Sequence, residues 1–352
     1  MTISWDLNSG DVLAALDLLK GARVVLMPTH QNVDADGLAS PMAVRLALAQ
    51  IGIDAYPVIT DGDLPTNLRF LPSIDSVLIY GQDELPDYDA ICLIDCADRI
   101  RLGRFSKDDM SRLDGRVPMV NIDHHVTNDR FGSVNIVVPD ASSSAEIVAA
   151  VLRAWGTTIT PDIAQCLLAG IYGDTLGLRT PSTTPSTMRT AAELVDGGAA
   201  LVPIVDALFR LKPRSTVCLW EHALRNVQWT GPLIWTELAR EGFLKCGAEM
   251  GEAEGLVNFL AGTEGSRVAV ILYQDEDEQG WRVSFRSLDE TVDVASIAAV
   301  FGGGGHPRAA GTHIEGGPAE RDAFIRRVAE LAEPPEVAAT GLSDGVAADG
   351  RR

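Results

Sequence analysis

Short runs of strand-forming apolar residues alternate with helical patterns along the N-terminal part of the chain. The runs at 24–27, 54–59, 88–94 and 117–120 stop abruptly where polar residues begin, which is typical of buried strands. Helices are predicted at 1–21, from about 39 to 50, at 147–155, from 161 to about 175, and at 185–196. Strands that alternate with helices predict a Rossmann-like α/β fold with a mainly parallel sheet.

The C-terminal part shows a different order of elements. After a helical connection, the pattern predicts a strand at 233–238, a helix at 253–260, a hairpin of 268–273 with 281–287, and helices at 294–300 and 318–332. The acidic segment 275–280 is expected to be an exposed turn, because the ligand spacing of an EF-hand is absent. We therefore expect a first domain at 1–200, a helical linker at 201–226, a smaller α/β domain at 227–332 and a disordered tail at 333–352.

Composition supports a globular protein, with 352 residues, 46% of them hydrophobic and 22% charged. No apolar run approaches the roughly 20 residues that span a bilayer, and the N-terminus lacks a secretory signal, so we expect a cytoplasmic protein. The five cysteines are odd in number and form no CxxC pair, which predicts reduced core thiols: Cys92, Cys96, Cys166, Cys218 and Cys246.

The formal net charge of −20 argues against binding to long duplex nucleic acid or to an anionic membrane, because both need a basic surface. A small anionic substrate that is held by bound metal ions remains compatible with this charge.

Potential metal ligands follow three of the predicted strands. His30, Asp34 and Asp36 follow the first strand, Asp95 follows the run at 88–94, and Asp123-His124-His125 follows the run at 117–120. In an open α/β sheet, ligands bind outside the carboxyl ends of the strands, so these groups are expected to meet. The alternative is that the aspartates only cap turns and helices, which remains open for each motif taken alone.

Two helix ends add to this picture. Asp174 lies near the C-terminal end of a predicted helix, where the macrodipole disfavours a carboxylate, and we favour a role facing a cation. The segment 140–146 resembles an N-cap and capping box, although a helix N-terminus also suits an anion. We favour the structural role for that segment.

A run of four glycines at 302–305 precedes His306. Successive glycines bring backbone N–H groups together with no side chain in the way, which predicts an anion-binding nest, and the alternative is a flexible hinge. Of the six histidines, four fall within these motifs, whereas His222 and His313 have ordinary structural roles.

Carboxylates and imidazoles without thiolates suit a hard or borderline divalent ion, and Mn²⁺ is the natural candidate. The candidate ligands exceed what one ion with an open position needs, so we expect two ions that share a bridging carboxylate and together activate water for attack on a phosphoryl group. We assign Asp95 as the bridge, Asp123 as an acceptor that orients an imidazole, and His125 to contact the scissile phosphate or protonate the leaving oxygen. The predicted ligands are His30, Asp34, Asp36, Asp95, His124 and Asp174.

These motifs resemble the DHH phosphoesterase family, named for a triplet such as Asp123-His124-His125. The likeness includes His30-x-x-x-Asp34-x-Asp36, Asp95 with Asp98, Gly173-Asp174-Thr175, the segment 284–287, and the glycine run with His306. It implies a DHH catalytic domain at 1–200 with two Mn²⁺ ions, and a DHH-associated domain in which a few residues hold the substrate: Arg286, Gly303, Gly304, Gly305 and His306.

Within the family, the second domain looks like that of NrnA-like oligoribonuclease/3′-phosphoadenosine 5′-phosphate phosphatases and of cyclic-di-AMP phosphodiesterases. The resemblance implies hydrolysis of short oligonucleotides to 5′-mononucleotides, with 3′-phosphoadenosine 5′-phosphate as a further substrate, and it implies a homodimer. The alternatives are hydrolysis of cyclic-di-AMP or linear dinucleotides, and an inactive nucleotide-sensing module.

Overall fold

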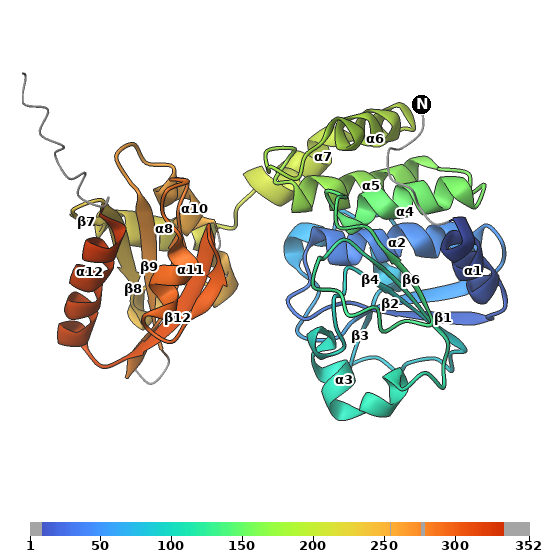
Figure 1. Ribbon diagram of the computed structural model, residues 1–352, viewed down its shortest axis with the longest axis horizontal. Coiled ribbons are helices and arrows are strands. Elements are labelled where there is room, and N and C mark those ends of the chain that lie inside the picture. Colours follow the sequence, from blue (N-terminus) through green and yellow to red (C-terminus); the bar gives the residue numbers. More distant parts are fainter. Residues whose placement is uncertain (1–8, 254, 276–278, 334–352) are drawn as a thin grey trace, which may run out of the picture. The chain divides into compact units, whose positions relative to one another are not determined.

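The computed structural model describes residues 9–253, 255–275 and 279–333, and the chain separates after Leu211 into two compact units (Figure 1). Nearly all of the predicted tail at 333–352 and residues 276–278 of the predicted acidic turn lie outside the described residues. Among the described residues, no helix combines the length and the apolar character needed to cross a membrane.

The first unit is built on a six-stranded sheet in the order β3-β2-β1-β4-β5-β6, in which every pairing is parallel. This confirms the predicted α/β class. Because the strand order reverses between β1 and β4, the crevice at the carboxyl ends of these strands is where such a fold binds ligands. The strands are β1 (Val24–Pro28), β2 (Asp54–Ile59), β3 (Leu78–Ile79), β4 (Ala90–Ile94), β5 (Met119–Asp123) and β6 (Val134–Val137).

Helices cover both faces of this sheet. Figure 1 shows α2, α4 and α5 together on one face with α6 outside α5, whereas α3 lies on the other face, where Phe105 packs on strand residues such as Leu26 and Ile91. Helices α2 and α5 approach closely, since a Cβ on Gly173 would lie 2.5 Å from the Cβ of Ala35. The helices are α1 (Ser9–Lys20), α2 (Ala35–Ala49), α3 (Arg104–Asp108), α4 (Ser144–Ala154), α5 (Pro161–Asp174), α6 (Pro185–Asp196) and α7 (Leu201–Val205).

The second unit has a mixed sheet in the order β11-β12-β10-β9-β8-β7, in which only β8 and β9 run parallel. One face packs against α11 and α12, and the other against α8 and α10. The elements are α8 (Arg214–Arg225), β7 (Gln228–Thr230), β8 (Leu233–Leu238), α9 (Arg240–Cys246), α10 (Leu256–Ala261), β9 (Val268–Gln274), β10 (Gly280–Arg286), α11 (Val294–Ala299), β11 (Gly304–His306), β12 (Ala309–Glu315) and α12 (Pro318–Ala332).

Two predictions are corrected here. Helix α2 begins at Ala35 and not near residue 39, because the Asp34 side chain caps it by accepting from the Gly37 N–H. The expectation that every cysteine is reduced is wrong for one pair, because Cys218 on α8 and Cys246 at the end of α9 form a disulfide. Their 28-residue separation gave no local signal of this pairing. The other three cysteines are free and buried.

Candidate metal centre

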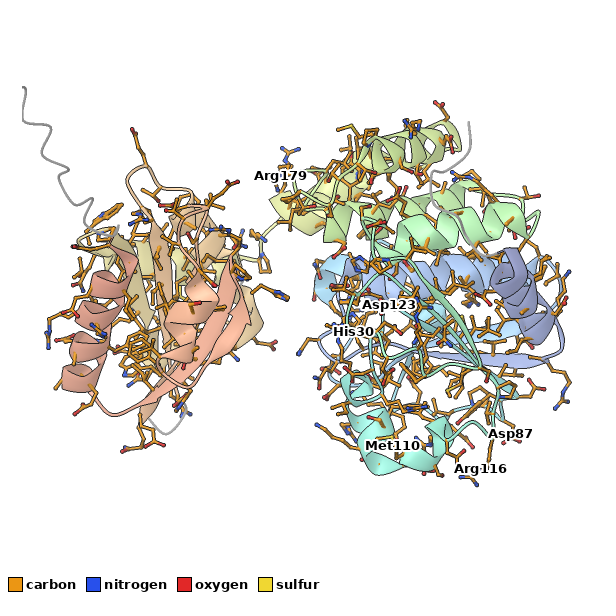
Figure 2. All side chains as sticks on the ribbon, in the orientation of Figure 1. His30, Asp87, Met110, Arg116, Asp123 and Arg179 are labelled. Atoms are coloured by element: carbon orange, nitrogen blue, oxygen red, sulfur yellow. A yellow bond between two sulfur atoms is a disulfide. The ribbon has the colours of Figure 1, made fainter. Side chains whose placement is uncertain are left out.

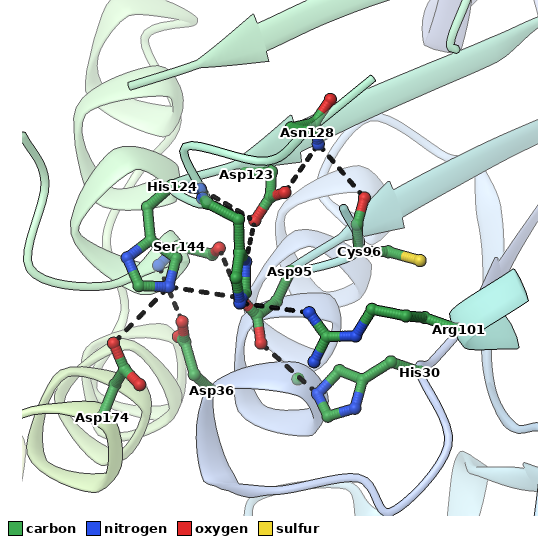
Figure 3. Close-up of polar contacts among 12 residues, drawn as sticks. His30, Asp36, Asp95, Cys96, Arg101, Asp123, His124, Asn128, Ser144 and Asp174 are labelled. Atoms are coloured by element: carbon green, nitrogen blue, oxygen red, sulfur yellow. Dashed lines mark hydrogen bonds and ion pairs between the residues drawn. The ribbon is translucent and has the colours of Figure 1, made fainter. Parts of the chain in front are cut away.

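The carboxyl ends of β1, β4 and β5 and the last residue of α5 deliver all six predicted ligands to one place. Figure 2 locates His30 and Asp123 in the first unit, and Figure 3 labels five of the six ligands: His30, Asp36, Asp95, His124 and Asp174. Three sets of donor atoms each lie within 4.8 Å of one another. These sets are His30, Asp34 and Asp95; Asp36, His124 and Asp174; and Asp95, Asp123, His124 and His125. Two of the sets share Asp95, so one carboxylate lies between two possible ion positions.

Asp95 follows β4 directly and has a positive φ of 60°, a conformation that aspartate tolerates better than most residues. Its Oδ2 atom lies 3.3 Å from His30 Nε2, whereas its Oδ1 atom lies 3.5 Å from His124 Nε2. The Ser144 hydroxyl donates to Oδ1 over 3.0 Å. Although burial opposes ionisation, the two imidazoles hold the pKa of Asp95 below its ordinary value. The carboxylate is therefore anionic and points one oxygen to each side.

Asp36 lies in the first turn of α2 and is buried. Its Oδ2 atom accepts from the backbone N–H of Ser144 over 2.7 Å, and its Oδ1 atom accepts from the N–H of Ala145 over 2.9 Å. The first amides of α4 therefore bind an anion, and that anion is a side chain of the protein. The α4 N-terminus also has its own cap, since Ser143 accepts from the Glu146 N–H. The N-cap predicted in segment 140–146 is therefore confirmed, whereas the Glu146 carboxylate accepts from Ser142 and Thr187 and completes no capping box.

Burial, together with the nearby carboxylates Asp95 and Asp174, raises the pKa of Asp36 well above its ordinary value. The protein alone thus concentrates more negative charge here than it compensates. A cation bound between these carboxylates would relieve that repulsion.

The His30 ring provides the most direct test of whether a metal fits. Its Nδ1 atom lies 2.9 Å from the Gln31 carbonyl, which fixes Nδ1 as a donor, so Nε2 carries the lone pair when the ring is neutral. Among the described residues, Nε2 is buried and forms no hydrogen bond, although it points at Asp95. A Cβ on residue 37 would lie only 2.4 Å from this atom, so only a glycine at this position leaves room for the ring. A buried lone pair aimed at carboxylates is the arrangement of a metal ligand.

His124 and Asp174 complete the second ion position. The Nε2 atom of His124 lies 3.5 Å from Asp95 Oδ1 and 3.5 Å from Asp174 Oδ2. Burial opposes protonation of both imidazoles, but the neighbouring carboxylates raise the pKa of His30 and of His124 to about 10. Burial and nearby carboxylates raise the pKa of Asp174 to about 6. Protons thus occupy positions that a divalent ion would take.

Asp123 and His125 form a pair beside the ligands. Asp123 is fully buried, and its Oδ1 atom lies 2.7 Å from His125 Nδ1 while accepting from the backbone N–H of His124 over 2.8 Å. Its Oδ2 atom accepts from the Asn128 amide over 2.6 Å. Asp123 therefore orients the His125 ring, whereas the ring of the candidate ligand His124 faces Asp95 and Asp174.

Comparisons with known proteins show which family the chain belongs to. Residues 24–171 match the model of the DHH family, N-terminal domain, and residues 238–333 match that of the DHHA1 domain. The chain is 32% identical over 296 residues to the bifunctional oligoribonuclease and PAP phosphatase NrnA of Thermus thermophilus, with 83% of this chain and 84% of that protein covered. The chain belongs to the DHH family.

Other relatives extend the likeness. The NrnA protein of Bacillus subtilis is 27% identical, with 82% of this chain and 89% of that protein covered. The structure of an exopolyphosphatase-related protein from Bacteroides fragilis superposes with a TM-score of 0.84 at 21% identity, covering 94% of this chain and all of that one. The latter likeness shows that the fold is shared.

The DHH unit also contains site residues that the sequence analysis did not assign. Arg101 donates to His125 Nε2 over 3.1 Å, Ser144 contacts Asp95, and Asn128 contacts Asp123 (Figure 3). The only sequence signal for Arg101 was its place after Asp98. Asp98 acts as a cap, since its Oδ1 atom accepts from the backbone N–H of Arg101 over 3.0 Å.

In the DHHA1 domain, the glycine run is ordered and paired. The N–H groups of Gly302 and Gly303 donate to carbonyls at the end of α11, and Gly304–His306 pair with β12. A Cβ on Gly303 would lie 2.2 Å from the Gly311 carbonyl, so this glycine is required for packing. The hinge alternative does not apply to a paired strand. Gly302, Gly304, Gly305 and His306 are exposed, but the Gly302 N–H is already bonded, which leaves Gly304, Gly305 and His306 as the exposed strand that an anion could meet.

Arg286 is the last residue of β10, in the register of Ala309 on β12. Its Nε donates to the Asn258 side chain over 2.9 Å. The structure thus places Arg286 on a strand of the same sheet as β11, two strands away from it.

Proposed function

We propose that this DHH protein is a Mn²⁺-dependent phosphohydrolase that cuts short oligonucleotides to 5′-mononucleotides and also removes a phosphate from 3′-phosphoadenosine 5′-phosphate. The observation that carries the proposal is Asp95, whose two oxygens face His30 on one side and His124 on the other. The relatives from Thermus thermophilus and Bacillus subtilis, both named as oligoribonuclease and PAP phosphatase, support the substrate class.

The donor set fits two divalent ions. His30, Asp34 and Asp95 would hold one ion, and Asp36, His124 and Asp174 would hold a second. Asp95 would join the second set through its Oδ1 atom, which lies 3.5 Å from His124 Nε2. Oxygen and imidazole donors without thiolate favour Mn²⁺ over a structural zinc. When bound, such a pair supplies Lewis acidity and a water of lowered pKa for in-line attack at phosphorus.

Other groups of the protein hold the candidate ligands and the His125 ring in position. The first amides of α4 fix Asp36, and the Ser144 hydroxyl fixes Asp95, so the ligands need little rearrangement when an ion binds. Asp123 holds the His125 ring, which is 30% exposed and therefore accessible to the scissile phosphate. The catalytic assignments are thus Asp95, Asp123 and His125.

The DHHA1 domain would contribute substrate-binding residues of its own. Arg286 supplies a guanidinium, and Gly304, Gly305 and His306 present exposed backbone and an imidazole on the edge strand β11. Gly303 supports this strand through its packing on β12. The expected homodimer is part of the proposal and is tested by light scattering.

The decisive experiment incubates the purified chain and Mn²⁺ with labelled di- to pentanucleotides. Release of 5′-mononucleotides is expected, and its absence for all lengths would remove the proposal. Comparison of kcat/KM for linear dinucleotides, 3′-phosphoadenosine 5′-phosphate and cyclic-di-AMP ranks the substrates. An Asp95→Asn variant separates an enzyme from a nucleotide sensor, because a sensor would keep its nucleotide affinity and its function.

A further inference from the structure

Arg101 reaches the metal centre from the short helical turn that follows β4. Its backbone N–H donates to Asp98, and its carbonyl accepts from the Gln31 N–H over 2.7 Å, which ties it to the loop that carries His30. The side chain is half-buried, and its Nη1 atom lies 3.1 Å from His125 Nε2. Figure 3 shows the guanidinium extending toward Asp95 beside the His30 ring. Its position is therefore fixed at both ends.

The Arg101 guanidinium lies beside an acidic cluster and yet forms no ion pair within the described part of the chain. Among the described residues, no carboxylate lies within the 4.0 Å ion-pair distance of Arg101, although the ligand cluster is rich in aspartate. Arg116, Arg267 and Arg321 each form such an ion pair. A guanidinium has five N–H donors in a planar fork, and only one bond of the Arg101 side chain is made within the described chain. The remaining donors suit an oxyanion.

The charge of the centre also calls for a further cation. The ligand carboxylates together with Asp123 carry five formal negative charges, and two divalent ions would leave a net charge of about −1. A phosphate that enters this centre meets residual repulsion. The guanidinium of Arg101 is the positive group that contacts His125, at the rim of the cluster.

We propose that Arg101 binds the phosphate of the substrate directly, as a substrate-binding residue of the DHH domain. The inference rests on the proposed function, since it names the group that receives the scissile phosphate. The competing role is positional, in which Arg101 only holds the His125 ring through the Nη1 contact. The two roles differ in what happens to anion binding when His125 is removed.

The test measures binding of orthophosphate to the Mn²⁺-loaded full chain by calorimetry, beside KM and kcat for a dinucleotide. Arg101→Ala is expected to weaken orthophosphate about 10- to 100-fold and to raise KM similarly, since a charge-assisted hydrogen bond is lost. The orthophosphate affinity and KM of Arg101→Lys should lie between those of the wild type and Arg101→Ala, because lysine keeps the charge but lacks the planar guanidinium. The matched control is Arg104→Ala, which removes an exposed arginine of the same segment and should leave both values within about twofold.

Mn²⁺ stoichiometry and thermal unfolding accompany each variant, so that loss of the ions or of the fold is separated from loss of anion binding. In a His125→Ala background, Arg101→Ala should still weaken orthophosphate about 10-fold if the contact is direct. Unchanged orthophosphate binding in that background, or in Arg101→Lys and Arg101→Ala alone, would overturn the proposal. A wild-type chain that binds orthophosphate through Arg101 but hydrolyses no oligonucleotide would instead refute the proposed function and leave this inference standing.

Discussion

The two units of the chain treat their charged side chains in opposite ways. In the second unit, Arg267 bonds Asp289, Thr291 and the Ala332 carbonyl, and Arg308 bonds carbonyls of the 289–292 turn. In the first unit, the buried Asp36 and Asp95 lie beside His30, whose Nε2 atom has no hydrogen bond within the described residues. The second unit therefore uses its charges to hold loops together, whereas the first gathers carboxylates whose excess negative charge a bound cation would balance.

The pKa values follow the same division. Arg267 and Thr291 lower the pKa of Asp289 below its ordinary value, because its charge is already compensated. In the first unit, desolvation and neighbouring carboxylates raise the pKa of Asp174 to about 6. Metal binding should stabilise the first unit, because its candidate ligands bind protons when no ion is present. It should not stabilise the second unit, whose charged groups already form ion pairs.

The largest expected effect comes from Asp95→Asn. Asparagine keeps the shape and tolerates the positive φ, but it removes the charge shared by both ion positions. We expect kcat/KM to fall by about 10³-fold or more, since removal of one electrostatic contact alone costs about 10²–10³ in rate. Elemental analysis should show loss of bound Mn²⁺. Asp289→Asn in the second unit is the control, and equal metal loss there would contradict the contrast between the units.

The next effect is the pH dependence of metal binding. Because His30 and His124 have pKa values of about 10, the metal-free centre holds both protons at neutral pH, and Mn²⁺ must displace them. Affinity should rise with pH, by up to about 100-fold per unit for two protons released, and level off above about pH 10. Calorimetry in buffers of different ionisation enthalpy counts the protons. A pH-independent affinity between 6.5 and 9 would show that the imidazoles are not ligands.

The same pKa values predict the stability of the metal-free protein. A histidine pKa raised from 6.5 to about 10 stabilises the fold fully below pH 6.5, and this contribution disappears as pH rises through 10. Chelated protein should therefore lose stability over this range in the unfolding transition of the first unit. In the second unit, chelation should not change how the unfolding transition depends on pH.

A pair of glycine substitutions compares the units through sterics. Gly37→Ala places a Cβ 2.4 Å from His30 Nε2, and we expect Mn²⁺ affinity to fall by about 10- to 100-fold, the range for disturbed ligand support. Alanine favours a helix, so the fold should survive. The matched control is Gly251→Ala, where nothing lies within 4 Å. Normal Mn²⁺ binding by Gly37→Ala would mean that His30 does not need its observed position.

The smallest predicted effect is on stability in the second unit. Arg267→Ala removes the ion pair to Asp289 and the bonds to Thr291 and Ala332. We expect the denaturant midpoint of this unit to fall, because a partly exposed ion pair and two hydrogen bonds are lost, and denaturant titration measures it. Mn²⁺ stoichiometry should stay the same. A fall in bound metal would contradict the separation of roles.

The sequence predicted the class of both units because their central strands and long helices have clear periodicity. Strand β8 and helices α6 and α12 have the predicted bounds. Strands β3 and β11 escaped prediction, since one has two residues and the other consists of two glycines and His306. Their pairing comes from tertiary contacts, which local patterns do not carry.

The candidate ligands were predictable because parallel strands bring their carboxyl ends to the same edge of the sheet. The roles of Ser144 and Arg101 were not, because each depends on contacts across the fold, such as the bond from Ser144 to Asp95. The Cys218–Cys246 disulfide was missed for the same reason, since it joins two helices that pack in the second unit.

Anomalous scattering at the manganese edge from a Mn²⁺-soaked crystal tests the central claim most directly. The account predicts two peaks roughly 3.5–4 Å apart. One should lie among His30, Asp34 and Asp95, and the other among Asp36, Asp95, His124 and Asp174. A single peak, or two peaks that do not share Asp95, would contradict it.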